Sequence, residues 1–226
     1  MPRVALLAHG AGSSPATALR LLSAAVADDV RPVTVEARGS VDDVVRRLHA
    51  AAAGHDVVLA AGISLGAHAV ASWSLDGGRA ESLLLVMPAW TGAPDHVAGL
   101  TDATADDIDA RGREAVLAEI TEQAPDDWVV RELVEGWATY TDPELAAALR
   151  AAGASHAPTR SDLARLAPPV VVVALADDPL HPEAVAREWA AAIPEAALVT
   201  VLRDAPAHDI GALGLAGRRA LQRCTG

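Results

Sequence analysis

The chain has 226 residues, which is enough for one compact domain with a sizeable insertion and too little for two full-sized domains. Hydrophobic residues make up 51% and charged residues 21%, so the chain can bury a core and is not intrinsically disordered. The 18 basic residues face 30 acidic ones, and the resulting net charge of −12 repels polyanions. This balance argues against nucleic-acid binding.

Cysteine and histidine usage gives no sign of a disulfide, a metal or another cofactor. Cys224 is the only cysteine, and no two of the eight histidines have the His-x-x-x-His spacing of a zinc helix. The apolar start after Arg3 is too short for a signal peptide, so we expect a cytoplasmic protein. The uncharged run over residues 57–75 approaches the length of a membrane span, but its glycines predict a strand, a turn and a helix instead.

Strand and helix patterns alternate at both ends of the chain and stop in the middle. Strands are predicted over residues 3–8, 32–37, 56–61, 81–87, 169–174 and 197–202, and helices over 14–27, 40–53, 65–75, 182–193 and 210–223. Residues 91–167 are instead acidic and helical, with an apolar stripe formed by Val130, Leu133, Val134 and Trp137. We therefore expect a doubly wound α/β core over 1–90 and 168–226, interrupted by a helical insertion.

One motif in this core carries chemistry. Gly62-Ile63-Ser64-Leu65-Gly66 lies between a predicted strand and a predicted helix, and it has the G-x-S-x-G form that lifts a serine hydroxyl out of a sharp turn. A serine needs an imidazole to take its proton and a carboxylate to orient that imidazole. Such groups follow the last two predicted strands, with Asp177, Asp178 and His181 in one loop and His208 in the other.

In this order of serine, acid and histidine, and in the Ala-His element before the last helix, the sequence resembles the α/β-hydrolase family. The resemblance implies that Ser64 is the nucleophile, Asp178 the acid and His208 the base. It also implies an oxyanion hole made by the N–H groups of Ala11 and Leu65, and a lid over residues 91–167. Family members usually have two strands ahead of the strand that leads into a His-Gly pair, which here is the strand over residues 3–8 followed by His9 and Gly10. Those two strands have no counterpart in this sequence, so six strands in the order 2-1-3-4-5-6 are expected.

Several residues have more than one interpretation. The glycine that often precedes the acid is missing, so the choice between Asp178 and Asp177 rests on the spacing of Asp178 to Pro182. Ser64 could merely start a helix, and His208 could merely cap one. His68 and His181 are interpreted as structural or loop residues, and His9 as a hydrogen-bonding residue that shapes the substrate loop together with Gly10. The tryptophans in or beside the lid could anchor it or form a substrate wall, and the candidates are Trp90, Trp128 and Trp137.

The predicted function is hydrolysis of a small or medium, largely apolar carboxylic ester through an acyl-enzyme on Ser64. Cleavage of a C–C bond, a lactone or a thioester, or a cyclisation, would use the same three residues. A dinucleotide site is a competing hypothesis, because Gly10-Ala11-Gly12 follows the first strand and Glu36 ends the second, but Pro15 stands where a third glycine is expected. A ligand-binding protein without turnover is a third possibility. The oligomeric state does not follow from the sequence.

Overall fold

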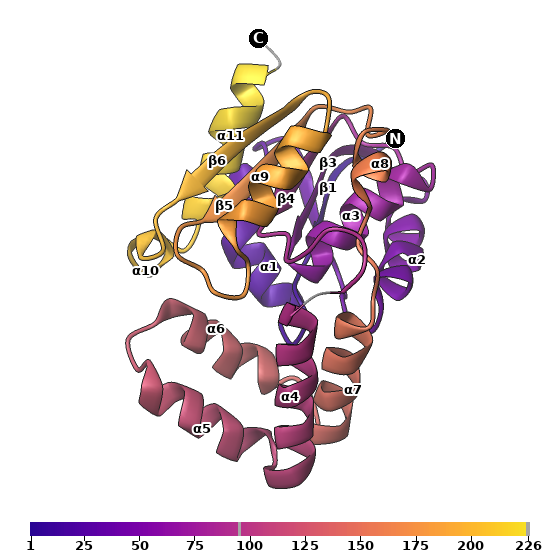
Figure 1. The fold of residues 1–226 in the computed structure, drawn as a ribbon. Coiled ribbons are helices and arrows are strands. Elements are labelled where there is room, and N and C mark those ends of the chain that lie inside the picture. The colour runs from indigo at the N-terminus through magenta and orange to yellow at the C-terminus, as the bar shows by residue number, and fades with distance from the viewer. Residues whose placement is uncertain (95, 225–226) are drawn as a thin grey trace.

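The computed structural model describes residues 1–94 and 96–224. Within them the chain forms a six-stranded sheet in which all neighbouring strands are parallel, in the order β2-β1-β3-β4-β5-β6. The strands are β1 (Arg3–Ala8), β2 (Arg31–Val35), β3 (Asp56–Ile63), β4 (Ser82–Val86), β5 (Val170–Leu175) and β6 (Ala196–Val201). The predicted fold class and strand order are therefore confirmed (Figure 1).

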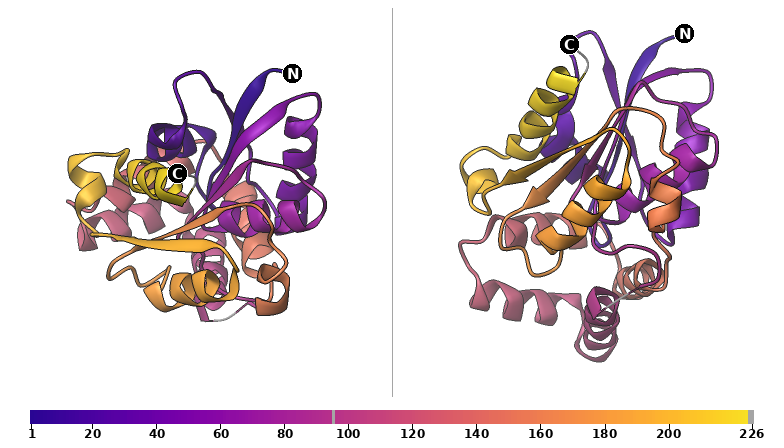
Figure 2. Two further views of the ribbon diagram at one scale, coloured as in Figure 1. Left: turned by 90° about the horizontal axis from the view of Figure 1, so that it is seen from above. Right: turned by 45° about the horizontal axis from the view of Figure 1, so that its top comes forward.

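Helices cover both faces of the sheet, as Figure 2 shows from two further sides. The core helices are α1 (Pro15–Leu22), the 3₁₀ turn η1 (Ser23–Ala25), α2 (Val41–Ala52), α3 (Leu65–Leu75), α8 (Arg160–Leu163), α9 (Glu183–Ala192), α10 (Ala205–His208) and α11 (Ala212–Cys224). The predicted helix starts are correct, because the Ser14 and Ser40 side chains each accept a hydrogen bond from a first-turn N–H. Helix α10 was not predicted. No helix in the described ranges is long and apolar enough to cross a membrane.

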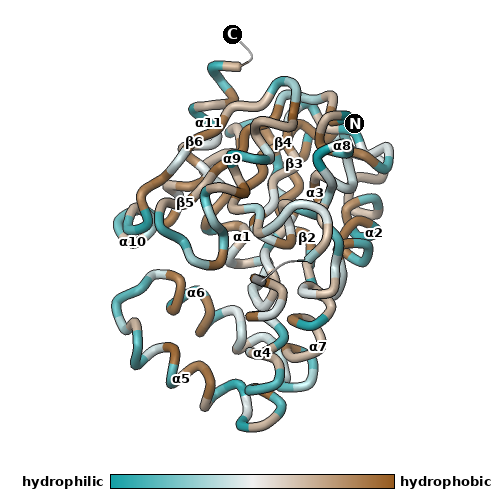
Figure 3. The backbone as a smooth tube through the Cα atoms, viewed as in Figure 1, coloured by the Kyte–Doolittle hydropathy of each residue, from teal (hydrophilic) through white to brown (hydrophobic). Residues whose placement is uncertain are grey.

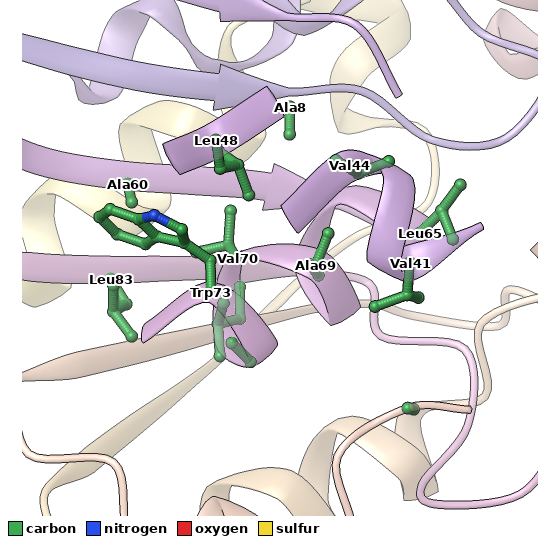
Figure 4. Close-up of a cluster of buried hydrophobic side chains, with 14 of the residues drawn as sticks. Ala8, Val41, Val44, Leu48, Ala60, Leu65, Ala69, Val70, Trp73 and Leu83 are labelled. Atoms are coloured by element: carbon green, nitrogen blue, oxygen red, sulfur yellow. The ribbon is translucent and has the colours of Figure 1, made fainter. Parts of the chain in front are cut away.

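The core has one apolar layer on each face of the sheet. Alternate residues of a strand point to opposite faces, so Leu6 packs under α2 and α3, while Leu7 packs under α1 and α11. Figure 4 shows the first of these layers, where Trp73 of α3 lies between Leu48 of α2 and Leu83 of β4. The hydropathy colouring accordingly concentrates apolar residues in the strands (Figure 3).

Four helices of the insertion project beyond the carboxyl ends of the strands: α4 (His96–Arg111), α5 (Arg113–Gln123), α6 (Trp128–Trp137) and α7 (Asp142–Gly153) (Figure 1). They share an apolar cluster of their own, which includes Ile108, Trp137 and Leu145. The predicted stripe is only partly buried, because Val134 is 44% exposed. The segment after α7 returns to the core, where Leu163 of α8 is buried. The projecting part thus ends before the predicted boundary at residue 167.

Candidate active site

Ser64 sits in a strained turn between β3 and α3. Its backbone angles are φ 55° and ψ −116°, a conformation that costs a non-glycine residue free energy and is found mainly at functional sites. The N–H of Ser64 donates to the carbonyl of Val86 on the neighbouring strand at 2.9 Å. This bond links the serine at the end of β3 to the end of β4. Ser64 is also the N-cap residue of α3.

This turn requires glycine at two positions, because neighbouring backbone segments come too close there to leave room for a side chain. A Cβ atom added to Gly62 would lie 2.1 Å from the carbonyl oxygen of Gly66, and one added to Gly66 would lie 2.5 Å from the carbonyl oxygen of Ala8. Neither position can therefore carry a side chain unless the backbone moves. This is the physical requirement behind the G-x-S-x-G spacing.

Backbone strain recurs at the carboxyl ends of three neighbouring strands. Ser64 after β3, Met87 after β4 and Asp177 after β5 are the non-glycine residues with positive φ in the described ranges. Such strain persists only where surrounding contacts enforce it. Its recurrence along one edge of the sheet marks that edge as the functional one, which is where ligands bind in open parallel sheets.

A cavity of about 290 Å³ opens at this edge. Its floor includes Ser64 and Met87 from the strand ends, and Asp178 and His181 approach from the loop after β5. The insertion supplies the opposite wall, which is largely apolar. The wall residues from this side include Leu100, Ile120, Trp128, Val129, Leu133 and Trp137.

The two residues expected to form an oxyanion hole, Leu65 and Ala11, both line the cavity. Leu65 is the first residue of α3, so its N–H has no partner within the helix, and Ala11 follows Gly10 in the loop after β1. A Cβ atom added to Gly10 would lie 3.3 Å from Cβ and 3.9 Å from Oγ of Ser64, so this loop packs against the serine. In the described part of the chain no hydrogen bond is found for either N–H.

Asp178 is the aspartate that faces the cavity, while Asp177 is exposed. Oδ1 of Asp178 accepts the N–H groups of Leu180 at 2.9 Å and His181 at 3.2 Å, and Oδ2 lies 3.2 Å from Nδ1 of His181. Burial raises the pKa of this carboxyl, but the hydrogen bond and charge of His181 and the two N–H groups outweigh burial and lower it. Asp178 is therefore ionised at neutral pH.

His208 lies outside the cavity. It is the last residue of α10, its side chain is exposed, and its Nδ1 donates to the carbonyl of Asp204 at 3.0 Å. It is not among the residues that line the cavity, and no hydrogen bond to Asp178 is found within the described ranges. The structure thus brings Ser64 and Asp178 to one site and does not bring His208 there.

Comparison of the fold with solved structures finds proteins of similar shape over nearly the whole chain. MenH of S. aureus is 16% identical, with a TM-score of 0.77 over 100% of this chain and 95% of that one. An esterase of Thermogutta terrifontis is 17% identical, with a TM-score of 0.71 over 100% and 91%. An enol-lactonase of Burkholderia xenovorans is 17% identical, with a TM-score of 0.67 over 88% and 82%.

The chain has the α/β-hydrolase fold. At these identities the likeness establishes the fold and not the activity. No protein-family model matches the sequence, and no curated protein matches it. The residues at the carboxyl edge of this α/β-hydrolase sheet are therefore the basis for assigning a function.

His181 belongs to the loop after β5, as interpreted from the sequence, and its place at the cavity was not predicted. Its side chain is 15% exposed and lines the cavity of the α/β-hydrolase fold beside Asp178. The spacing Asp178-x-x-His181 could have indicated this, because an aspartate often accepts backbone N–H groups two and three residues ahead. Such a turn brings the third residue back over the carboxylate.

His9 does not line the cavity and is a buried hydrogen-bonding residue at the start of the loop after β1. Its Nδ1 donates to the carbonyl of Gly10 at 2.8 Å, and its Nε2 lies 2.7 Å from the Glu36 carboxylate and 2.8 Å from the N–H of Ala37. His9 therefore ties the end of β1 to the end of β2. Gly10 itself lines the cavity.

All three tryptophans proposed for substrate contact line the cavity and are buried. They also have structural partners. Nε1 of Trp90 donates to the carbonyl of Ser155 at 3.2 Å, and Nε1 of Trp128 donates to the carbonyl of Arg203 at 2.8 Å. Trp137 belongs to the apolar cluster of the insertion. The two interpretations of these tryptophans, anchor and wall, are thus compatible.

Proposed function

We propose that this protein is a serine hydrolase that cleaves a small or medium, largely apolar carboxylic ester through an acyl-enzyme on Ser64. The observation that carries the proposal is the strained Ser64 at the head of α3, in one cavity with the ionised Asp178. The unused N–H groups of Ala11 and Leu65 would stabilise the oxyanion that forms when Ser64 attacks. Nucleophile, carboxylate and oxyanion donors are the parts that acyl transfer requires.

The cavity wall supports an uncharged, apolar substrate. Ile63, Met87 and Leu133 contribute apolar surface to it. Two of its charged members are paired within the protein, Arg203 with Asp127 and Glu132 with Arg20. Residues 91–167 also carry 15 acidic residues against 6 arginines, which disfavours highly anionic substrates such as coenzyme A thioesters.

The helical insertion is proposed to act as a lid. Helix α6 is held to the core near both of its ends, because Arg203 pairs with Asp127 before its first residue and Arg20 pairs with Glu132 and Glu135. The hydroxyl of Tyr140, just beyond α6, also donates to the carbonyl of Ser13 at 2.9 Å. These contacts support a wall that closes the cavity and excludes water.

An imidazole must take the proton of Ser64, and two histidines are candidates. Resemblance to the α/β-hydrolase family proposes His208, which can serve only if residues 204–209 turn toward Asp178, because it is exposed in this structure. His181 already contacts Asp178. Acyl transfer on Ser64 would proceed in the same way with either imidazole as the base.

Active-site labelling tests the proposal directly. We expect a fluorophosphonate probe to label the protein covalently, because only an activated serine reacts readily with it. Ser64→Ala should abolish the label and the hydrolysis of p-nitrophenyl esters, while Ser13→Ala, which changes another cavity serine, should preserve both. Labelling that persists unchanged in Ser64→Ala contradicts the assignment.

The same assays separate the alternative functions. A lactone, a thioester and a C–C-bonded diketone should be compared with the esters, because Ser64 could open all of them, and a cyclisation would appear as a product without added water. If the fluorophosphonate probe does not label the protein, we would instead expect a ligand-binding protein without turnover. A rise in its melting temperature with NAD would then favour a dinucleotide-binding site. The Glu36 carboxylate contacts His9 and Arg38, which leaves it poorly placed for a ribose.

A further inference from the structure

Arg203 lies two residues after β6 and contacts both the insertion and the acid of the proposed site. Its Nη2 donates to Oδ2 of Asp127 at 2.5 Å, and its Nη1 lies 3.7 Å from Oδ2 of Asp178. Its backbone carbonyl accepts the Nε1–H of Trp128 at 2.8 Å. Asp127 is the N-cap of α6 and Trp128 is its first residue, so Arg203 is bound to the start of that helix through both its side chain and its backbone.

The guanidinium of Arg203 joins two carboxylates, one at the start of α6 and one in the loop after β5. The Asp178 side chain is 6% exposed, that of Asp127 21% and that of Arg203 34%, and Arg203 lines the cavity together with Ser64. Ion pairs between fully exposed side chains contribute little, but a pair with a buried carboxylate is screened much less by water and salt. Because the guanidinium is planar and rigid, a displacement of α6 would also move Nη1 relative to Asp178.

We propose that Arg203 is a positioning residue that bridges α6 of the insertion to the catalytic acid and keeps the base neutral by its charge. This inference rests on the proposed function, in which Asp178 orients an imidazole that takes the proton of Ser64. Whichever imidazole serves, it must lie against Asp178 and therefore close to the Arg203 cation, whose charge disfavours the protonated ring. The neutral ring is the form that can accept the serine proton.

The charges around Asp178 determine the direction of this effect. The ionisable side chains that face Asp178, or pair with a group at the cavity, are in the described ranges His181, Arg203, Asp127, Glu132, Arg20 and His68. Their exposed neighbours are Asp177, Asp204 and His208. Glu132 pairs with Arg20, and burial keeps His68 neutral by lowering its pKa to about 3. Besides the imidazoles, what remains is a pair of carboxylates that share Arg203. Loss of Arg203 leaves both without this cation, whereas loss of the Asp127 charge leaves Arg203 to Asp178 alone.

The pH dependence of the reaction tests the proposal. Because the base must be neutral, kcat/KM for p-nitrophenyl acetate and the rate of fluorophosphonate labelling should both rise with pH through a midpoint. Arg203→Gln should move this midpoint to higher pH by about 0.5 unit or more, because the protonated ring loses a neighbouring like charge. Arg203→Lys keeps the charge and should return the midpoint to within about 0.2 unit of the unmodified protein. A residue that only stabilised the fold would lower the rates without moving the midpoint.

Asp127→Asn should have the opposite effect on the midpoint. Asparagine caps a helix as well as aspartate does, so the bond from the N–H of Val129 to Oδ1 of residue 127 is kept. The variant removes one negative charge and leaves Arg203 to Asp178, so the midpoint should fall by about 0.2 unit or more. KM should also rise, because α6 loses one of its contacts with the core.

Arg38→Gln is the matched control. Arg38 also ties the insertion to the core, because its Nη2 donates to the carbonyl of Thr139 at 2.9 Å. It follows β2, however, which is four strands from β5 in the sheet. At about 4.8 Å per strand this separation exceeds the Debye length of about 10 Å, so the midpoint should stay within about 0.2 unit. An equal shift in Arg38→Gln would show a response to net charge alone and would overturn the proposal.

The two charge variants decide the proposal. It is overturned by an unchanged midpoint in Arg203→Gln, or by a midpoint that stays or rises in Asp127→Asn. If Arg203→Gln does not fold, Asp127→Asn, which retains the cation, decides alone. Ser64→Ala is measured in parallel, because labelling or hydrolysis that survives it contradicts the proposed function itself. Activity that depends on Ser64 but shows no such shifts contradicts only the role of Arg203.

A double-mutant cycle tests the contact with Asp178 independently of activity. The urea midpoint of unfolding is compared for the unmodified chain, Arg203→Gln, Asp178→Asn and the double variant. The loss caused by Arg203→Gln should be smaller when residue 178 is already asparagine, because the ion pair is then absent. Equal losses in the two backgrounds would overturn the bridge.

Discussion

The loops after β5 and β6 both leave the carboxyl edge of the sheet with an acid and a histidine, yet only one of them delivers these groups to the cavity. In residues 176–182 the Asp178 carboxylate turns inward and its partners are N–H groups and the ring of His181. In residues 202–209 the chain closes into the short helix α10, and Leu202 is 69% exposed. The ring of His208 is bonded within its own turn.

The edge of a sheet thus determines where a loop begins, while hydrogen bonds inside the loop determine which side chains point inward. The positive φ of Asp177 reverses the chain just before the acid. In the second loop, consecutive bonds from the N–H groups of Ala205, Ala207 and Asp209 to earlier carbonyls wind a helix that presents His208 to solvent. The predictions below test this contrast, beginning with the largest effect.

We expect removal of the Asp178 charge to have the largest effect on catalysis. Asp178→Asn should lower kcat by about 10⁴-fold, or about 5 kcal/mol of transition-state stabilisation, because the imidazole loses its orienting carboxylate. Asp204→Asn in the other loop is the matched control and should change kcat less than about threefold, because only the backbone carbonyl of Asp204 is used. Steady-state kinetics on a p-nitrophenyl ester measures both.

An equally deep loss in Asp204→Asn would mean that the loop after β6 takes part in the reaction. A loss in Asp177→Asn that exceeds the loss in Asp178→Asn would move the acid to the neighbouring position. That outcome would contradict the inward orientation of Asp178 in the cavity.

Much of this site could be predicted from the sequence, because its main determinants are local. The glycines around Ser64 specify a turn that only they can form, and the alternation of strands and helices places that turn at the carboxyl edge. The inward orientation of Asp178 agrees with its spacing to Pro182. These features depend on backbone sterics and periodicity, which a sequence shows directly.

The remaining features depend on contacts that periodicity does not show. His9 follows β1 as a substrate-loop histidine would, but Glu36 and Ala37, about 27 residues away, engage its ring. Val134 matches the helical stripe of α6, yet it is exposed because the insertion packs on a different side of that helix. The contact of His181 with Asp178 was not predicted, because its partner is the turn that it belongs to.

The second prediction concerns His68, whose ring packs against the rings of Trp90 and Trp189. Its Nε2 accepts the N–H of Ala89 at 3.0 Å, and burial lowers its pKa from 6.5 to about 3, with His181 adding to the effect. The neutral ring is therefore part of the fold. Because the unfolded chain binds the proton more readily, this stability is fully present above pH 6.5 and is lost as the pH falls toward 3.

At pH 5 the loss should be about 2 kcal/mol relative to pH 8. His68→Gln keeps an acceptor for Ala89 but has no titrating group, so its free energy of unfolding should fall less over this range. Urea denaturation at pH 8 and pH 5 measures the difference. His49→Gln, which changes a half-exposed histidine, is the control and should behave like the unmodified chain. Equal acid sensitivity in His68→Gln would contradict the buried neutral ring.

The third prediction concerns the contact that ties the loop after β6 to the insertion. Nε1 of Trp128 donates to the carbonyl of Arg203 at 2.8 Å, so Trp128→Phe removes one hydrogen bond while keeping an aromatic ring. We expect a loss of about 1 kcal/mol in the free energy of unfolding. Hydrogen exchange should become faster in residues 202–209 and unchanged in residues 176–182, which mass spectrometry can resolve. Faster exchange in both loops would mean that they move as one unit.

The smallest expected effect concerns whether the insertion contributes to selectivity for the acyl-chain length of the substrate. Trp137 lines the cavity and is buried in the cluster of α4, α6 and α7, so Trp137→Leu removes wall area while leaving an apolar side chain. For acetyl, butyryl and octanoyl esters, the gain in kcat/KM per methylene should shrink, by at most about 0.8 kcal/mol for each methylene that is no longer buried. Leu202→Ala, in the exposed part of the loop after β6, should leave the ratios unchanged. If Trp137→Leu lowers the melting temperature while these ratios stay fixed, the tryptophan only anchors the insertion, and the acyl chain lies along the strand-end wall near Met87 instead.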